Sequence, residues 1–204
     1  MTNDEIVKDR IIAVGRERFF EEGFSKISVD ELTSALSMSK KTFYQIFESK
    51  EDLVTQIMER MMGEVRANVE QITMGDQSFV QKLYGLMTFL GMQVGKLGRP
   101  FQQDLQRYLP GLWIRIEEFR RERIIENFTR LIEQGMNEGL IRKDVNKRIF
   151  LLAFLGAIEN IVRPSVLTHE SFSAGEAVQG IMGIFFKGIM TAEASGELDK
   201  LQQN

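Results

Sequence analysis

Apolar residues recur every three or four positions along nearly all of this 204-residue chain, and that spacing restricts it to a fold built from helices. Runs that alternate apolar and polar residues, as half-buried strands do, are hard to find. The longest regular apolar stripe comprises Leu53, Ile57, Met61, Val65, Val69 and Ile72. The sequence therefore predicts an all-α protein.

Breaks in the helical pattern divide the chain into two predicted domains. Residues 1–52 contain short segments and predict a small three-helix domain, whereas residues 53–204 predict a larger helical domain. The larger domain begins with a long connector helix over residues 53–74, which Gly75 ends. Beyond the connector, we predict helices near residues 78–97, up to 108, 113–136, 146–162 and 174–194.

Composition excludes several classes of protein. The formal net charge is -3, so any cationic surface must be local. The chain has no cysteine, which excludes disulfides, thiolate metal sites and thiol catalysis. The longest uncharged apolar run, residues 149–158, is too short to span a bilayer, and no secretory segment opens the chain. We therefore expect a cytoplasmic protein that needs no membrane, metal or cofactor.

Three serines mark predicted helix starts within residues 28–50. Ser28 precedes Glu31 by three residues and Ser49 precedes Asp52 likewise, the spacing of a capping box, while Ser39 is a simple N-cap. A cap contributes about 1 kcal/mol, which is too little to hold a helix of roughly eight residues in isolation. These helices must be held by packing, and their tight connection predicts a helix-turn-helix.

The second helix of this pair carries polar side chains that a small core does not need. Residues 37–47 contain no acidic residue. Lysine, threonine, tyrosine and glutamine side chains can contact DNA phosphates, and several of them can reach base edges. The candidates are Lys40, Lys41, Thr42, Tyr44 and Gln45. A polar face that only meets solvent is the alternative reading of the same residues.

Residues 10–53 resemble the DNA-binding domain of tetracycline-repressor-like (TetR-family) regulators. The most specific part is SKKTFYQIFESKEDL, residues 39–53, and Gly23, Phe24, Ser28 and Val29 match upstream. In the matching part, the residues that carry the signature are Ser39, Lys40, Thr42, Tyr44, Phe47, Ser49, Lys50 and Leu53. The resemblance covers about a quarter of the chain, and the remainder agrees in length and helix count.

The resemblance implies a homodimer that binds a palindromic double-stranded DNA operator and is released by a small-molecule effector. It also implies that Ser28, Lys50 and Tyr44 contact phosphates, and that Ser39 belongs to the DNA-binding set. The residues it implies as candidates for reading the groove are Lys40, Lys41, Thr42 and Gln45. Repressor is favoured over activator by the resemblance alone. Three positions depart from the family pattern: Ser37 replaces a usual glycine, Lys41 replaces a small residue, and Gln45 with Ile46 replaces an aromatic–histidine pair. The first departure predicts a less strained or different turn at Ser37.

Residues of the larger domain suggest an effector pocket and a dimer interface. Methionines and aromatics suit an adaptable apolar pocket for an apolar or amphipathic ligand, although each is more commonly a core residue. The pocket candidates are Met87, Met92, Tyr108, Trp113, Phe119, Phe128, Glu159 and Asn160. The pattern leaves open whether Glu159 and Asn160 face a pocket or a partner. We expect ligand binding to move the connector helix and so change the spacing of two DNA-binding heads.

The last two predicted helices are apolar around most of their circumference and therefore need cover on most sides. A four-helix interface between two copies of the chain would supply it, and a wholly internal core is the alternative. The dimer candidates are Leu152, Gly156, Ile181, Phe185 and Ile189.

Two other classes of protein compete with a DNA-binding regulator. An enzyme is disfavoured because the sole histidine, His169, has only Glu170 as a candidate acid–base partner, and no nucleophile motif is present. The second rival is a helical ligand-binding or adaptor protein without sequence-specific DNA binding.

Overall fold

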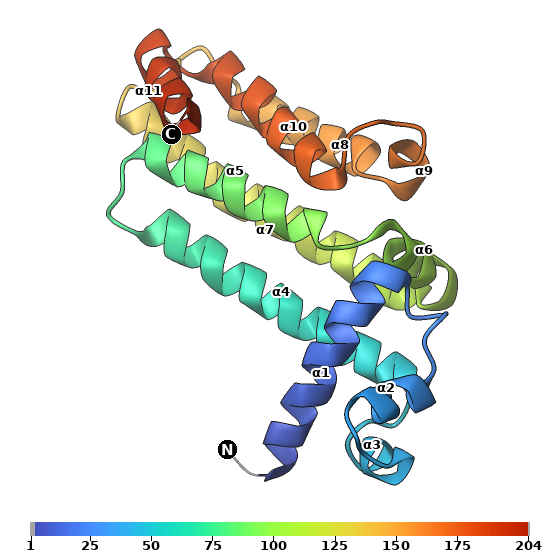
Figure 1. The fold of residues 1–204 in the computed structure, drawn as a ribbon. Helices are drawn as coiled ribbons and strands as arrows, with labels where there is room; N and C mark the ends of the chain where they lie inside the picture. Colours follow the sequence, from blue (N-terminus) through green and yellow to red (C-terminus); the bar gives the residue numbers. More distant parts are fainter. Residues whose placement is uncertain (1–2, 204) are drawn as a thin grey trace. The chain divides into compact units, whose positions relative to one another are not determined.

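The computed structural model describes residues 3–203, which form helices with no strand among them (Figure 1). The predicted all-α fold is confirmed. The helices are α1 (Asn3–Glu22), α2 (Val29–Ala35), α3 (Lys40–Ile46), α4 (Lys50–Met74), α5 (Phe79–Gly95), α6 (Arg99–Tyr108), α7 (Pro110–Asn137), α8 (Lys147–Ile161), α9 (Pro164–Leu167), α10 (Ala174–Ile189) and α11 (Ala192–Gln203). Within the described residues, no helix has the length and apolar character needed to cross a membrane.

The helices group into two compact units. The first contains residues 1–64 together with 96–117, and the second contains residues 65–95 together with 118–204. The division falls inside α4 and inside α7, so both helices run from one unit into the other. The segment that includes α6 therefore belongs with the N-terminal helices, a grouping that the linear order of the helices does not indicate.

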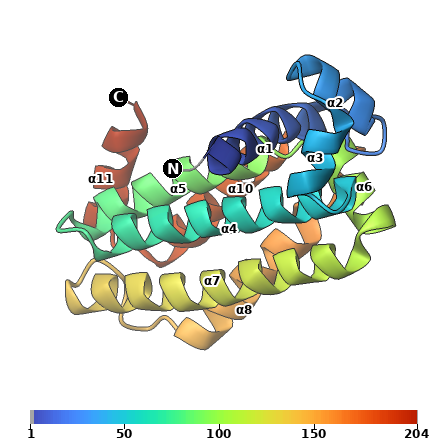
Figure 2. The same cartoon turned by 90° about the horizontal axis from the view of Figure 1, so that it is seen from below.

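Caps define the short helices of the first unit. Gly23 follows α1 with φ of 86°, the left-handed conformation that commonly ends a helix. Ser28 begins α2 with a capping box, in which its hydroxyl accepts from the Glu31 amide while the Glu31 carboxylate accepts from the Ser28 amide. Ser39 begins α3 by accepting from the Thr42 amide. Helices α1, α2 and α3 lie side by side in both views of the ribbon (Figures 1 and 2).

The turn between α2 and α3 is a Schellman motif centred on Ser37. The Ser37 amide donates to the Ser34 carbonyl, and the Met38 amide donates to the Thr33 carbonyl. Ser37 adopts φ of 53°, so the prediction of a less strained conformation is wrong. The turn needs a left-handed residue at this position to close both hydrogen bonds, and the chain keeps that geometry without glycine.

Helix α6 packs on α1 within the first unit. The Gly98 amide donates to the Phe20 carbonyl at 3.0 Å, and a Cβ at Gly98 would lie only 2.1 Å from that oxygen. The Phe101 ring lies 4.8 Å from that of Phe20, and the Asp104 carboxylate accepts from the Ser25 amide at 2.7 Å. The end of α1 and the loop after it are thus fixed by α6, close to the start of α2.

The second unit has its core between α5, α7, α8 and α10. Glycines allow α5 and α10 to approach closely, because a Cβ at Gly175 would lie 2.6 Å from the Gly91 carbonyl oxygen. The rings of Phe128, Phe154 and Phe186 form a cluster with centroids 5.0–6.0 Å apart. This packing fixes one side of α8 and one side of α10 inside the chain.

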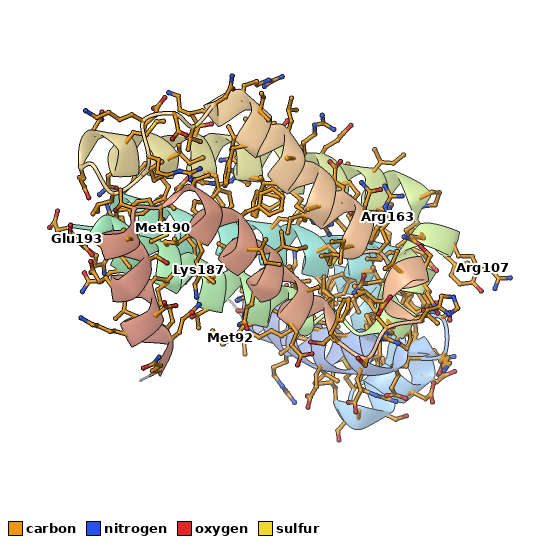
Figure 3. All side chains as sticks on the ribbon, turned by 90° about the horizontal axis from the view of Figure 1, so that it is seen from above. Met92, Arg107, Arg163, Lys187, Met190 and Glu193 are labelled. Carbon is orange, nitrogen blue, oxygen red and sulfur yellow. The ribbon has the colours of Figure 1, made fainter. Side chains whose placement is uncertain are left out.

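The chain breaks the predicted final helix over residues 174–194 into α10 and α11. Residues 140–142 and 189–191 pair as an isolated antiparallel bridge, in which the Arg142 amide donates to the Ile189 carbonyl and the Thr191 amide donates to the Leu140 carbonyl. Met190 is buried and extended at this break. Lys187 of α10 then pairs with Asp199 of α11; Figure 3 labels Lys187, Met190 and Glu193 along this segment.

Candidate functional site

Helix α3 presents a polar face on a buried aromatic base. Phe43 and Phe47 are fully buried and their rings pack 5.5 Å apart, which fixes the rotation of α3 about its axis. That rotation leaves Lys41, Tyr44 and Gln45 exposed. Tyr44 is 54% exposed although its ring packs edge-on against Phe43 at 5.3 Å. The face therefore offers one cation and two hydrogen-bonding groups from neighbouring turns of one helix.

The predicted serine contacts are already engaged in capping. The Ser28 hydroxyl accepts from the Glu31 amide and donates to the Glu31 carboxylate at 2.7 Å. These bonds to the Ser28 amide and hydroxyl hold the pKa of Glu31 below its usual value. The Ser39 hydroxyl accepts from the Thr42 amide and lies 3.0 Å from the Thr42 hydroxyl, with Thr42 half-buried. Both serines are exposed, so each can still meet an acceptor or donor from outside.

Lys50 opens α4 and donates to two main-chain carbonyls. Its Nζ lies 2.8 Å from the Phe24 oxygen and 2.9 Å from the Ile27 oxygen, both in the loop between α1 and α2. A cation is disfavoured at a helix N-terminus, and these two carbonyl oxygens compensate that position. The predicted phosphate contact would use the remaining hydrogen of the ammonium group, since lysine carries three donors.

Lys40, at the first position of α3, forms an ion pair with Asp30 of α2. Its Nζ lies 2.8 Å from Asp30 Oδ1, and both side chains are more than half exposed. The hydrogen bond to the Asp30 carboxylate raises the pKa of Lys40. Sequence reasoning missed Asp30, because it lies ten positions before Lys40 and meets it only through the packing of α2 against α3.

Comparison with known proteins supports a single assignment for this unit. Residues 11–57 match the family model described as "Bacterial regulatory proteins, tetR family". Residues 11–57 therefore form a DNA-binding domain of the TetR family. Members of this family are DNA-binding transcriptional regulators, so this protein is a transcriptional regulator and not an enzyme.

Two relatives are similar to this chain over most of its length. It is 24% identical over 186 residues to the uncharacterized HTH-type transcriptional regulator YvaF of Bacillus subtilis (strain 168), covering 90% of this chain and 96% of that protein. It is 26% identical over 155 residues to the HTH-type transcriptional repressor DhaR of Mycobacterium sp. (strain GP1), covering 68% and 72% of the two chains. A crystal structure of a transcriptional regulator from Cytophaga hutchinsonii shares the fold, with a TM-score of 0.70, 19% identity and coverage of 90% and 98%.

The second unit contains a partly open cavity of about 70 Å³ with an almost wholly apolar wall. Four helices contribute to it, and each contributes residues spaced four apart. The described lining residues are Leu90, Val94, Arg120, Ile124, Phe128, Phe154, Ile158, Val162, Val178 and Met182. Arg120 is the charged member of this set. No cluster of three candidate metal ligands occurs among residues 3–203.

Of the predicted pocket residues, Phe128 lines this cavity. Met87 is buried in the core of the second unit, whereas Met92 is 54% exposed (Figure 3). Tyr108 and Trp113 lie in the first unit, where the Tyr108 ring packs 6.1 Å from that of Phe24. The sequence shows spacings of four, but it does not show which face of each helix meets the cavity.

The other three predicted pocket residues make contacts away from the cavity lining. Phe119 packs against the guanidinium groups of Arg66 and Arg123, at 5.8 and 5.9 Å from its ring centroid. The Glu159 carboxylate pairs with Arg121 at 3.5 Å. The Asn160 amide donates to the Gly156 carbonyl, and its side chain is exposed.

The predicted dimer residues divide between the surface and the core. Leu152 of α8 is 46% exposed and Gly156 is half-buried. Ile181 and Ile189 of α10 are buried within this chain, because that side of α10 packs on α5 and α8. Phe185 is half-buried, with its ring 5.8 Å from Phe150 and 5.6 Å from Phe154.

The exposed side of α10 is a different set of residues, rotated by about one position from the predicted set. Ile184 is 75% exposed, and Gly180 and Gly188 lie one turn before and after it. On α8, Ile149 is 65% exposed, one turn before Leu152. We call Ile149, Leu152, Gly156, Gly180, Ile184 and Gly188 the α8–α10 face.

Proposed function

We propose that this TetR-family regulator is a repressor that binds a palindromic DNA operator as a homodimer and releases it when an apolar effector binds. The observation that carries the proposal is the polar face of α3, which is exposed on a rigid aromatic base in the segment that the family model matches. In this proposal residues 1–52 form the DNA-binding domain and residues 53–204 the effector-binding and dimerisation domain. The relative DhaR is a transcriptional repressor, which supports repression rather than activation.

Lys41, Tyr44 and Gln45 are the side chains that we propose reach the operator first. They lie within five residues of α3, which is the second helix of the helix-turn-helix and so the one expected to enter a major groove. Lys40 and Thr42, at the start of the same helix, add further contacts to the DNA. Ser28, Ser39 and Lys50 contact phosphates and so orient the domain on the DNA backbone. Phosphate contacts give affinity and base contacts give specificity, so the two groups predict different mutant phenotypes.

Selection from a random duplex pool tests the operator proposal. The purified full chain at near-physiological salt should enrich a palindrome whose half-sites are separated by about one helical turn of DNA or a multiple of it. Absence of enrichment, from a preparation shown to be folded and dimeric, contradicts the repressor proposal and favours the adaptor alternative.

Three mid-helix glycines support a second subunit on the α8–α10 face. Glycine inside a helix costs about 0.5–1 kcal/mol relative to alanine. A Cβ at Gly156, Gly180 or Gly188 would meet no atom of this chain within 4 Å, so the packing of the described chain does not require glycine there. Close approach by another helix would require it. Exposed Ile184 and Ile149 then provide the apolar surface that such a partner buries.

Ile184→Glu tests this interface, with Ile114→Glu as the matched control. Both isoleucines are more than half exposed, but Ile114 lies on α7 in the first unit. We expect Ile184→Glu to yield monomers in sedimentation or light scattering, and Ile114→Glu to remain dimeric. A dimer that survives Ile184→Glu with unchanged affinity contradicts the assignment of this face.

The cavity supports an apolar effector. A polar ligand atom would find almost no partner on its wall, and an unpaired buried polar group is costly. Apolar cavities of about 150 Å³ bind benzene-sized molecules, so a ligand must be compact or must displace a flexible wall residue. Met182 is suited to such movement because methionine has several rotatable bonds. Helices α4 and α7, continuous between the two units, offer a route by which binding alters the DNA-binding head.

A one-methylene change tests the cavity as the effector site. Val178→Ile should fill part of it and weaken binding of small hydrocarbons and alcohols in a thermal-shift series, whereas Val145→Ile, outside the lining set, should not. Ligands that stabilise the protein should also lower operator affinity, because an effector must prefer one conformation to act. If a ligand raises the Tm of Val178→Ile and Val145→Ile equally, the cavity is not the effector site.

A further inference from the structure

An acidic side chain stands against the cationic start of α3, in the surface that we propose meets DNA. Asp30 lies in the first turn of α2, and its carboxylate holds the Lys40 ammonium at 2.8 Å. Residues 37–47 contain no acidic residue, and the packing of α2 against α3 brings the Asp30 carboxylate to Lys40. An ion pair with both side chains more than half exposed contributes little to folding stability, so stability does not explain it.

The pair changes which acceptors Lys40 can meet. A phosphate oxygen carries a negative charge and is repelled by the adjacent carboxylate. A base-edge acceptor such as guanine O6 or N7 is uncharged and is not repelled in this way. Lysine has three N–H donors, so Lys40 can keep one hydrogen bond to Asp30 while it donates others to a base edge.

We propose that Asp30 is a specificity-determining residue of this regulator, because it keeps Lys40 from neutralising phosphates of arbitrary DNA and reserves it for base edges of the operator. The proposal rests on the DNA-binding function proposed above. Asp30 acts through Lys40 and need not touch DNA itself. Its removal should raise affinity for any duplex while lowering the preference for the operator.

The expected change follows from counterion release. Each phosphate neutralised on duplex DNA adds about 0.9 to the slope of log affinity against log salt. In Asp30→Asn, Lys40 becomes available to one more phosphate, so the slope for a random-sequence duplex should steepen by about 0.9. At about 0.15 M salt this corresponds to roughly fivefold tighter non-specific binding. Operator affinity should rise less, so the ratio of specific to non-specific affinity falls by up to about fivefold.

Two matched variants separate this effect from a simple change in net charge. Glu48→Gln removes one negative charge from an exposed residue of the same unit, between α3 and α4, and should leave the specificity ratio unchanged. Lys40→Gln should abolish the effect of Asp30→Asn when the two are combined. Circular dichroism of each variant checks that α2 and α3 remain folded.

The measurement is the affinity of the full chain for its selected operator and for a random-sequence duplex of equal length, between about 50 and 200 mM salt. An equal fivefold gain from Glu48→Gln, or a gain from Asp30→Asn that persists without Lys40, overturns the proposal. An unchanged ratio in Asp30→Asn also overturns it while leaving operator binding intact. If the unmodified chain itself shows no operator preference, the proposed function fails instead.

Discussion

Lys50 has two candidate roles: it can hold the loop between α1 and α2 in place, or it can contact a DNA phosphate. The substitution Lys50→Met separates these roles. The substitution keeps an unbranched apolar side chain of similar length but removes the ammonium that donates to Phe24 and Ile27. Hydrogen bonds from charged groups contribute about 1.5–3 kcal/mol each in net terms. Because Lys50 is half-buried and water can replace part of the loss, we take about 2 kcal/mol for both bonds together.

That loss is large enough to measure. For a chain of this size, 1 kcal/mol at the midpoint shifts the Tm by about 2–4 °C, so Lys50→Met should lower the Tm by about 4–8 °C. Exposed Lys41 provides the control. Lys41→Met should leave the Tm nearly unchanged, because surface substitutions change stability by at most about 0.5 kcal/mol. It should reduce the salt slope of DNA binding by about 0.9 if that side chain neutralises one phosphate.

The two variants should therefore show opposite patterns, as measured by calorimetry and by salt-dependent binding to a random-sequence duplex. Lys50→Met should affect stability more than the salt slope, and Lys41→Met the reverse. A Lys50→Met protein with an unchanged Tm and a slope lowered by about 0.9 would refute the loop-holding role and restore Lys50 as mainly a phosphate contact.

Three further outcomes are expected. Ser37→Gly should raise stability by about 0.5–1 kcal/mol in denaturant titration, because left-handed strain at φ of 53° exceeds the added backbone entropy; a loss of stability would contradict this. Gly175→Ala should cost about 1–3 kcal/mol, because its Cβ would lie 2.6 Å from the Gly91 carbonyl oxygen; an unchanged Tm would contradict close packing of α5 on α10. Stability should fall as the pH drops below the ordinary Glu31 pKa of 4.5 toward its lowered folded value, and Glu31→Gln should reduce that dependence; identical pH profiles would contradict it.

Local signals predicted the starts and the buried side of the short helices in the first unit. Serine caps acted at Ser28 and Ser39 as the sequence indicated, since a cap depends on residues within three positions of it. Burial of Phe43 and Phe47 follows from helical spacing, and the exposed side of α3 then follows by elimination. The Asp30–Lys40 pair depends on how two helices pack, which spacing along one helix does not encode.

Tertiary contacts also decided the end of the chain. The helical pattern continues through residues 174–194, so it predicts a single helix. The structure ends α10 at Ile189 because residues 189–191 exchange hydrogen bonds with residues 140–142, which lie almost fifty positions earlier. At this break the main chain forms hydrogen bonds to residues 140–142 that a continuous helix would not form, and the apolar Met190 is buried there.

The rotation of α10 decides which of its apolar residues stay exposed, and they are not the residues predicted for the dimer interface. Its sequence is apolar on adjacent faces, one through Ile181, Phe185 and Ile189 and the next through Ile184. Apolar character therefore does not decide which face turns inward. Gly175 marks the inward side of α10, because a side chain there would clash with α5. Gly180 and Gly188 flank Ile184 on the open side, where the contacts of this chain make no such demand. The packing of this chain therefore explains the glycine at Gly175 and leaves the side of α10 that carries Ile184 open.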